Sequence, residues 1–263
     1  MEMNIKTNNK SVSLDNTNQA IVIRNLVKNF GDIIAVNQLN LEIKNGELFS
    51  LLGPNGAGKT TTINILSGLI KPTEGSVFVG GYDIRKELNP IKNLIGVCPQ
   101  EAAIYKFLTG KENLELFGYL HGMTKEDIKN RSEYLLNTLD FLEASKRKVK
   151  GYSGGMLRKL NMLMALIHDP KIAFLDEPTV GMDPRARRKV WEFIKSLKTQ
   201  NKTIILTTHY MEEAEALSDR VGIIDYGELI ANGTPEELIK KFEVKNLEEV
   251  FLKITGRRIV EGI

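Results

Sequence analysis

The chain has 263 residues, of which 42% are hydrophobic and 26% are charged. These proportions are ordinary for a globular protein, and a single cysteine excludes a disulfide framework. The net charge of +3 is too small to indicate nucleic-acid binding. No window approaches the roughly 18 apolar residues of a membrane span, and the first residues lack the apolar core of a signal peptide. We therefore expect a cytoplasmic protein that reaches a membrane only through a partner.

The first hundred residues are predicted to form strands with one helix. Residues 1–18 are polar and rich in Asn, Ser and Thr, which predicts a flexible N-terminal tail. Apolar or alternating runs then predict short strands separated by turns or loops. We expect these strands at residues 21–23, 39–43, 48–52 and 76–79, and the helix from about residue 61.

A glycine-rich segment follows the predicted strand at 48–52. It fits the G-x-x-x-x-G-K-[ST] pattern of a phosphate-binding loop in full and reads Gly53-Pro54-Asn55-Gly56-Ala57-Gly58-Lys59-Thr60-Thr61. Backbone N–H groups of such a turn, and the positive end of the helix after it, converge on an anion. Lys59 adds charge for the β- and γ-phosphates, and the Thr60 hydroxyl is placed to ligate Mg²⁺. Because a strand precedes the loop and a helix follows it, we favour a nucleoside triphosphate site over a turn with an incidental lysine.

The middle of the chain changes from strands to helices. Apolar residues at helical spacing predict helices over 114–120, 128–139 and 156–167. The next run, 172–175, is apolar throughout, as in strands covered on both faces. We therefore expect a helical insertion, about residues 101–167, in a parallel α/β core. The remaining predictions are a helix over 190–197, a strand over 203–207, a short helix from 211, a strand over 221–224, one last strand between turns at 227 and 232–233, and a helix from Pro235.

Two acidic residues end the apolar strand. Asp176 and Glu177 follow residues 172–175 directly, and carboxyl ends of strands face the ligand crevice in an open α/β sheet. There Asp176 can hold Mg²⁺, while Glu177 reaches the water that attacks the γ-phosphate. Alone, two such carboxylates could equally start a turn. With a phosphate-binding loop upstream, the catalytic interpretation becomes strong.

The helix predicted over 156–167 has an unusual start. Tyr152-Ser153-Gly154-Gly155-Met156 offers Ser153 as an N-cap and two glycines that leave backbone N–H groups accessible. A plain capped helix would explain this segment by itself. Its position just before the acidic strand favours a second anion-binding helix start.

Together these segments resemble the nucleotide-binding subunit of an ATP-binding cassette (ABC) transporter. The resemblance covers roughly residues 20–235, with an ATP-binding domain over 19–235 and a C-terminal helical extension over 236–263. It implies an α/β P-loop NTPase (RecA-like) core with an antiparallel β subdomain and an inserted α-helical subdomain. The matching motifs, in chain order, are an adenine-stacking aromatic (Phe30), Walker A (53–61), the Q-loop (Gln100), the signature (152–156), Walker B (172–177), the D-loop (Gly181-Met182-Asp183) and the switch histidine (His209).

The resemblance also implies how the site is assembled. Family members form head-to-tail dimers that sandwich two ATP molecules, so each site would combine residues of two copies. ATP and Mg²⁺ would be bound by Lys59, Thr60, Gln100, Asp176, Glu177 and His209 of one copy, with Ser153, Gly154 and Gly155 from the other. Asp183 of the D-loop is a further expected nucleotide-binding residue. Glu177 would be the general base, assisted by Lys59, Gln100 and His209, and Thr60, Gln100 and Asp176 would hold the metal. Without the other motifs, His209 could equally be a polar residue at a strand end.

Two departures from the family pattern stand in the signature. Met156 replaces the family's glutamine and Tyr152 its leucine, whereas the Ser-Gly-Gly centre that would contact phosphate is intact. We therefore expect an active site. No guanine-specificity motif of the Asn-Lys-x-Asp type is present, because Thr203 and Ile204 follow Asn201-Lys202. ATP is thus expected in preference to GTP.

Segments around the motifs resemble the drug- and antibiotic-export branch of the family, notably 108–114, 177–184 and 233–238. This implies an ATPase subunit on the inner face of the cell membrane, bound to a separate integral membrane permease. The permease would dock near residues 100–120, where the candidate groove residues are Tyr105, Phe107, Leu108, Phe117 and Tyr119. The basic run 146–150 could meet that partner or acidic lipid, or be a solvated face.

Three other classes remain as alternatives. A soluble ABC ATPase acting on ribosomes or nucleic acid usually carries two cassettes, and this chain has a single Walker A motif. A DNA-repair ATPase of the structural-maintenance type would need a long coiled coil, and no sustained heptad run is present. An importer subunit or a regulatory nucleotide sensor is the third. We therefore expect a second copy of the chain and a permease as partners, and no nucleic acid.

Overall fold

A computed structural model describes residues 18–101 and 104–257. Apart from residue 18, the predicted N-terminal tail lies outside the described residues, as do residues 258–263 of the predicted C-terminal extension. The described chain forms a six-stranded sheet and a four-stranded sheet with helices around them.

The larger sheet carries the strands on which the motifs lie. Its order is β10-β9-β3-β8-β7-β6, and all neighbours are parallel except β10, which pairs with β9 in antiparallel fashion. Every residue of β3, β7 and β8 is buried, so these strands are covered on both faces, as predicted for residues 172–175. The strands are β3 (Leu48–Leu52), β6 (Ile95–Cys98), β7 (Ile172–Asp176), β8 (Thr203–Thr208), β9 (Arg220–Asp225) and β10 (Glu228–Gly233).

The smaller sheet is antiparallel, with the order β2-β1-β4-β5. Its strands are β1 (Gln19–Phe30), β2 (Ile33–Lys44), β4 (Glu74–Val79) and β5 (Tyr82–Asp83). β1 and β2 extend well beyond the apolar runs predicted at 21–23 and 39–43, because their paired backbones continue through partly exposed polar residues. Apolar side chains of both sheets and of helix α1 (Lys59–Leu66) share one core.

One helix before residue 100 was not predicted. α2 (Leu88–Leu94) has seven residues, and Ile91 is its one buried residue. Leu88, Ile91 and Leu94 stand at helical spacing, but the segment is short and has a proline inside it, which argued against a helix. The expectation of a single helix in this part of the chain was therefore wrong.

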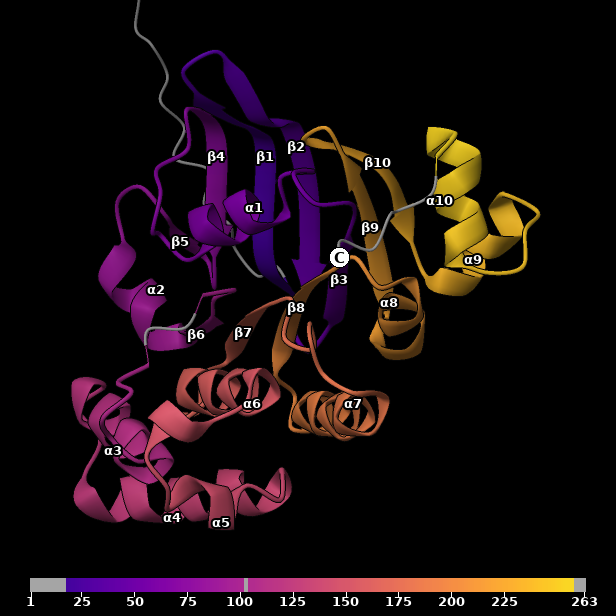
Figure 1. The fold of residues 1–263 in the computed structure, drawn as a ribbon. Coiled ribbons are helices and arrows are strands. Elements are labelled where there is room, and N and C mark those ends of the chain that lie inside the picture. Colours follow the sequence, from indigo (N-terminus) through magenta and orange to yellow (C-terminus); the bar gives the residue numbers. More distant parts are fainter. Residues whose placement is uncertain (1–17, 102–103, 258–263) are drawn as a thin grey trace, which may run out of the picture.

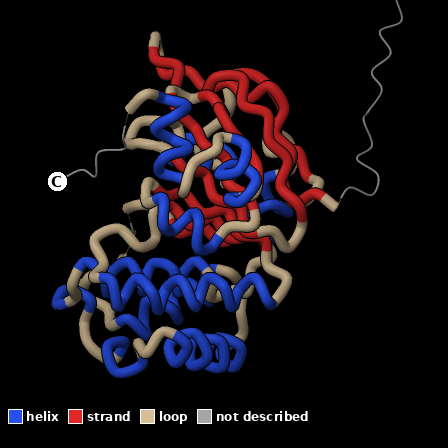
Figure 2. Tube along the Cα trace, turned by 90° about the vertical axis from the view of Figure 1, so that its right-hand side faces the viewer, coloured by secondary structure: helices blue, strands red, loops and turns tan. Residues whose placement is uncertain are grey.

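The predicted helical insertion lies on one side of the larger sheet (Figure 1). It contains α3 (Gly110–Leu120), α4 (Lys125–Thr138), α5 (Leu142–Ser145), the 3₁₀ turn at Val149–Gly151 and α6 (Gly154–Ala165). Figure 2 shows these helices gathered beneath the strands. Leu114 and Leu135 of the helices share an apolar cluster with Leu175 of β7 and Leu206 of β8, so the helices and the sheet are held by one core. Cys98 lies in the same cluster, where burial raises the pKa of its thiol to about 12.

The remaining helices flank the second half of the sheet. α7 (Pro184–Thr199) follows β7, and α8 (Met211–Leu217) follows β8. α9 (Pro235–Lys241) starts where Pro235 predicted, with Thr234 and Glu237 forming a capping box, and α10 (Leu247–Thr255) packs with it and with β9 in a third apolar cluster. Within residues 18–101 and 104–257, no helix is both long and apolar enough to cross a membrane.

Candidate functional site

The glycine-rich segment forms the loop between β3 and α1 that its sequence predicted. Gly56 has φ +81° and Gly58 has φ +102°, a region that residues with a side chain rarely adopt. Space is restricted as well, since a Cβ at Gly53 would overlap the carbonyl oxygen of Ile224 and one at Gly58 that of Ala35. The loop therefore requires glycine for both conformation and close packing.

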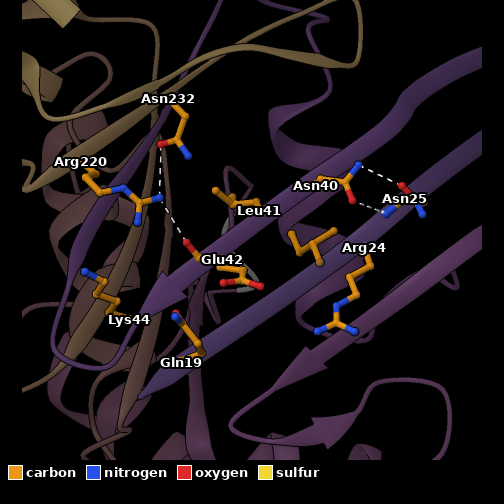
Figure 3. A pocket seen from close by; sticks show the side chains of 10 residues that line it. Gln19, Arg24, Asn25, Asn40, Leu41, Glu42, Lys44, Arg220 and Asn232 are labelled. Atoms are coloured by element: carbon orange, nitrogen blue, oxygen red, sulfur yellow. Dashed lines mark hydrogen bonds between the residues drawn. The ribbon is translucent and has the colours of Figure 1, made fainter. Parts of the chain in front are cut away.

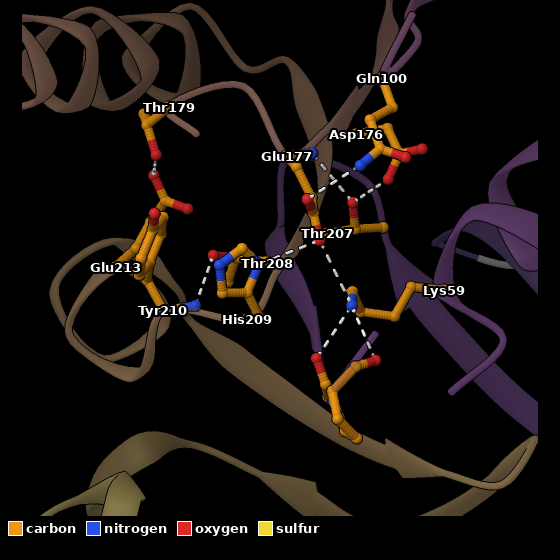
Figure 4. Close-up of polar contacts among 12 residues, drawn as sticks. Lys59, Gln100, Asp176, Glu177, Thr179, Thr207, Thr208, His209, Tyr210 and Glu213 are labelled. Atoms are coloured by element: carbon orange, nitrogen blue, oxygen red, sulfur yellow. Dashed lines mark hydrogen bonds and ion pairs between the residues drawn. The ribbon is translucent and has the colours of Figure 1, made fainter. Parts of the chain in front are cut away.

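Lys59 points back into this loop (Figure 4). Its Nζ donates hydrogen bonds to the carbonyl oxygens of Gly53 (2.9 Å) and Pro54 (3.1 Å) and lies 3.4 Å from Oε1 of Glu177. The residue is 4% exposed. Burial lowers the pKa of Lys59, and the Glu177 carboxylate opposes that shift. The ammonium group is thus held at the inner end of the loop, where phosphates would enter.

Glu177 is the centre of the polar contacts. Its Oε1 faces Lys59 and lies 3.1 Å from Nδ1 of His209, and its Oε2 accepts a hydrogen bond from Nε2 of Gln100 (3.3 Å). Its backbone has φ +49° and its N–H donates to both the carbonyl and the hydroxyl of Thr207, each at 3.1 Å. Burial raises the pKa of Glu177, but the His209 hydrogen bond and the Lys59 charge outweigh it, so the pKa is lowered overall.

Asp176 lies just before Glu177 and is almost fully buried. Burial raises its pKa, while hydrogen bonds from the hydroxyls of Thr207 and Thr60 oppose the shift. Carboxylate, hydroxyl and amide oxygens are the donors that Mg²⁺ prefers. Asp176, Thr60 and the amide oxygen of Gln100 supply that set, so the residues present fit this metal.

A cavity of about 270 Å³ opens over these side chains. Its volume is just below the roughly 300 Å³ at which small-molecule sites begin, and its floor is the phosphate-binding loop. Ala35 of β2 also lines it, although no motif in the sequence includes this residue. The lining residues are Ala35, Asn55, Gly56, Gly58, Lys59, Thr60, Thr61, Gln100 and Glu177.

Ten residues predicted for the site do not line this cavity. Five of them belong to the loop or to the contacts around Glu177, namely Gly53, Pro54, Ala57, Asp176 and His209, and the other five are Phe30, Ser153, Gly154, Gly155 and Asp183. Phe30 lies at the end of β1, 46% exposed, with the ammonium of Lys28 4.7 Å from its ring centre. Ser153 caps α6, accepting from the N–H of Met156 (3.4 Å), and Asp183 caps α7, accepting from the N–H of Ala186 (2.9 Å). Gly154 and Gly155 form the first turn of α6, with open space around Gly154.

A larger groove lies elsewhere, on the outer face of the antiparallel sheet (Figure 3). Its volume is about 650 Å³, and several of the polar side chains that line it hydrogen-bond to other protein groups. Arg220 donates to the carbonyl oxygen of Glu42 and to Asn232, both at 3.2 Å, and the side chain of Asn40 donates to that of Asn25. We therefore assign the site to the smaller cavity, where a loop, a lysine and carboxylates converge.

Fold and site together define a P-loop NTPase. Comparison with known proteins narrows the class, because a model of the ABC transporter family matches residues 36–180. The linearmycin resistance ATP-binding protein LnrL of Bacillus subtilis is 44% identical over 87% of this chain and 76% of its own length. The doxorubicin resistance ATP-binding protein DrrA of Mycobacterium tuberculosis is 43% identical over 85% of this chain and 68% of its own length.

Solved structures agree with the sequence relatives. The ATP-binding subunit of an ABC transporter superposes with a TM-score of 0.82 at 26% identity, covering 90% of this chain and 99% of that one. A bacterial ABC transporter cassette solved as a dimer gives a TM-score of 0.76 at 29% identity, covering 81% and 98%. The chain belongs to the ABC transporter family, and it binds and hydrolyses ATP. The predicted fold class and family resemblance are thereby confirmed.

The loop packing can be tested with two glycine variants. Both Gly56→Ala and Gly58→Ala place a side chain at positive φ, but only the latter also forces a Cβ against the Ala35 carbonyl oxygen. Gly58→Ala should therefore lower the free energy of unfolding by at least about 1 kcal/mol more than Gly56→Ala. Denaturation without nucleotide measures this difference free of ATP binding. Equal losses would contradict the packing described.

Proposed function

We propose that this chain is the ATP-hydrolysing subunit of an exporter whose transport path is formed by a separate membrane permease. Two relatives are named as drug-resistance ATP-binding proteins. The sequences around the motifs also resemble those of the export branch of the family. On this proposal the chain lies at the inner face of the cell membrane, bound to the permease.

The contacts of Glu177 with Lys59, Gln100 and His209 carry the proposed mechanism. Lys59 would leave the carbonyls of its own loop to bind the β- and γ-phosphates, because phosphate offers it a stronger anionic partner. Glu177, ionised and held beside the γ-phosphate, would orient the attacking water and accept its proton. His209, already hydrogen-bonded to Glu177, would hold the γ-phosphate and the same water.

The other residues of the site would bind the nucleotide and the metal ion and would take no part in proton transfer. Backbone N–H groups over 53–61 would donate to the phosphate oxygens at the start of α1, and Phe30 would stack on the adenine. Thr60, Gln100 and Asp176 would hold Mg²⁺, which when bound neutralises negative charge on the phosphates. The side chain of Gln100 would thus contact both the metal ion, through its amide oxygen, and Glu177, through the hydrogen bond from Nε2.

A second copy of the chain would complete each site. The start of α6, formed by Ser153, Gly154 and Gly155, does not line the cavity around Lys59. The space around Gly154 is open. An accessible helix start attracts an anion, so this one is suited to the γ-phosphate bound to another copy. Asp183 at the start of α7 would meet the same interface. The related cassette solved as a dimer supports the pairing of two copies.

A set of exposed apolar side chains on the helical insertion is suited to the permease. It consists of Tyr105, Phe107, Tyr119 and Leu120, whose exposed fractions are 55%, 79%, 53% and 70%. Of the other candidate groove residues, Phe117 packs against the core and Leu108 is half-buried. The basic run lies next to this surface, since the N–H of Val149 donates to the carbonyl oxygen of Leu108 (2.9 Å).

Glu177→Gln tests the hydrolytic mechanism. The variant keeps the shape of the site but removes the base, so ATP should still bind while kcat falls by about 100-fold or more. Unhydrolysed ATP should then hold two copies together, which size-exclusion chromatography with and without ATP would detect. Hydrolysis at the parental rate would remove Glu177 from its assigned role.

Phe107→Ala tests the docking surface. Phe107 is the most exposed member, so its loss should reduce the permease that co-purifies with the tagged chain by about tenfold. Tyr82→Ala, which removes an exposed aromatic from the antiparallel sheet, is the matched control. Equal recovery of permease with both variants would refute the assigned surface.

A further inference from the structure

Glu213 is a buried carboxylate outside the cavity around Lys59. It lies on α8 with no exposed surface. Its Oε1 accepts hydrogen bonds from Oγ1 of Thr179 (2.6 Å) and from Nε1 of Trp191 (2.8 Å). Burial raises the pKa of Glu213, and hydrogen bonds from Thr179, Thr208 and Trp191 oppose that shift. A carboxylate is costly to bury, so the two donors directed at Oε1 of Glu213 indicate a specific connection.

The two ends of the Thr179–Glu213 hydrogen bond belong to the two catalytic segments. Thr179 is two residues beyond Glu177, in a turn closed by the N–H of Val180 donating to Glu177 (3.4 Å). Glu213 is four residues beyond His209, in the first turn of α8. The intervening Tyr210 is fixed, because its N–H donates to the hydroxyl of Thr208 (3.0 Å). Figure 4 shows the Thr179–Glu213 contact on one side of the Glu177–His209 pair.

Glu177 needs support from both directions along its backbone. Its φ of +49° is unusual for a residue with a side chain and persists only where the surroundings hold it. Thr207 holds the backbone N–H of Glu177 on the strand side. Thr179, anchored by Glu213, holds the chain on the other side. Movement of this turn would separate Glu177 from Nδ1 of His209, now 3.1 Å away.

We infer that Glu213 is a positioning residue for hydrolysis, which, by accepting the Thr179 hydroxyl, keeps Glu177 and His209 in contact. This inference rests on the proposed roles of those two residues. Trp191 contacts the same oxygen of Glu213 from α7, but it does not join the two catalytic segments. Removing the Thr179 hydrogen bond should therefore slow hydrolysis, whereas removing the Trp191 hydrogen bond should not.

Thr179→Val removes the hydroxyl while keeping the shape of the side chain. We expect kcat for ATP to fall about tenfold or more while KM changes by less than about twofold, because positioning acts on hydrolysis rather than on binding. Thr179→Ser, which keeps the hydroxyl, should restore most of the rate. Trp191→Phe is the matched control, since it removes the other hydrogen bond to Oε1, and its kcat should stay within about twofold of the parental value. Melting temperatures show whether each variant is folded, and Thr179→Ala is the substitute if the valine variant is not.

Parental kcat in a folded Thr179→Val or Thr179→Ala variant would overturn the inference, as would an equal loss in Trp191→Phe. A double variant adds a readout that a purely structural role would not move. If Glu213 acts through Glu177, adding Thr179→Val to Glu177→Gln should not lower the residual rate further. If Glu177→Gln itself hydrolyses ATP at the parental rate, the proposed function fails instead, so the two failures are distinguishable.

Discussion

The ion pair between Lys59 and Glu177 is the interaction on which the rest of the site depends. Its side chains are 4% and 6% exposed, and Nζ lies 3.4 Å from Oε1. Two charges with so little access to water stabilise each other. Removing one partner of such a buried pair typically lowers the free energy of unfolding by about 3–5 kcal/mol. Each group therefore holds the other in the position that the proposed mechanism requires. When a triphosphate arrives, it competes for Lys59, and we expect Glu177 to be left facing the γ-phosphate and its water.

The strand order of the larger sheet explains why these groups meet. β3 leads into the phosphate-binding loop, β7 ends in Asp176, and β8 lies between them. Because the three strands are parallel, their carboxyl ends lie at the same edge of the sheet. β8 adds Thr207, whose hydroxyl donates to Asp176 and accepts from the N–H of Glu177, and then leads to His209. One central strand thus orients both acidic residues and supplies the histidine.

The sequence predicted what consecutive residues encode. The loop over 53–61, the buried strand over 172–175 and the capped start of α6 were each visible as local patterns, and the structure contains all three. α2 was missed because it has only seven residues and contains Pro90, although Leu88, Ile91 and Leu94 stand at helical spacing. Ala35 in the cavity wall and the Thr179–Glu213 contact could not be predicted, because they arise from segments brought together only by tertiary packing.

A site completed by a second copy is tested most directly by mixing two inactive variants. Lys59→Ala removes the phosphate-binding charge, and Gly154→Asp places a negative charge at the start of α6, where open space tolerates a side chain. In a head-to-tail dimer of the two, one site carries both defects and the other carries neither. ATP hydrolysis by the mixture should therefore rise well above the sum of the separate variants. Activity no greater than that sum would contradict a shared site.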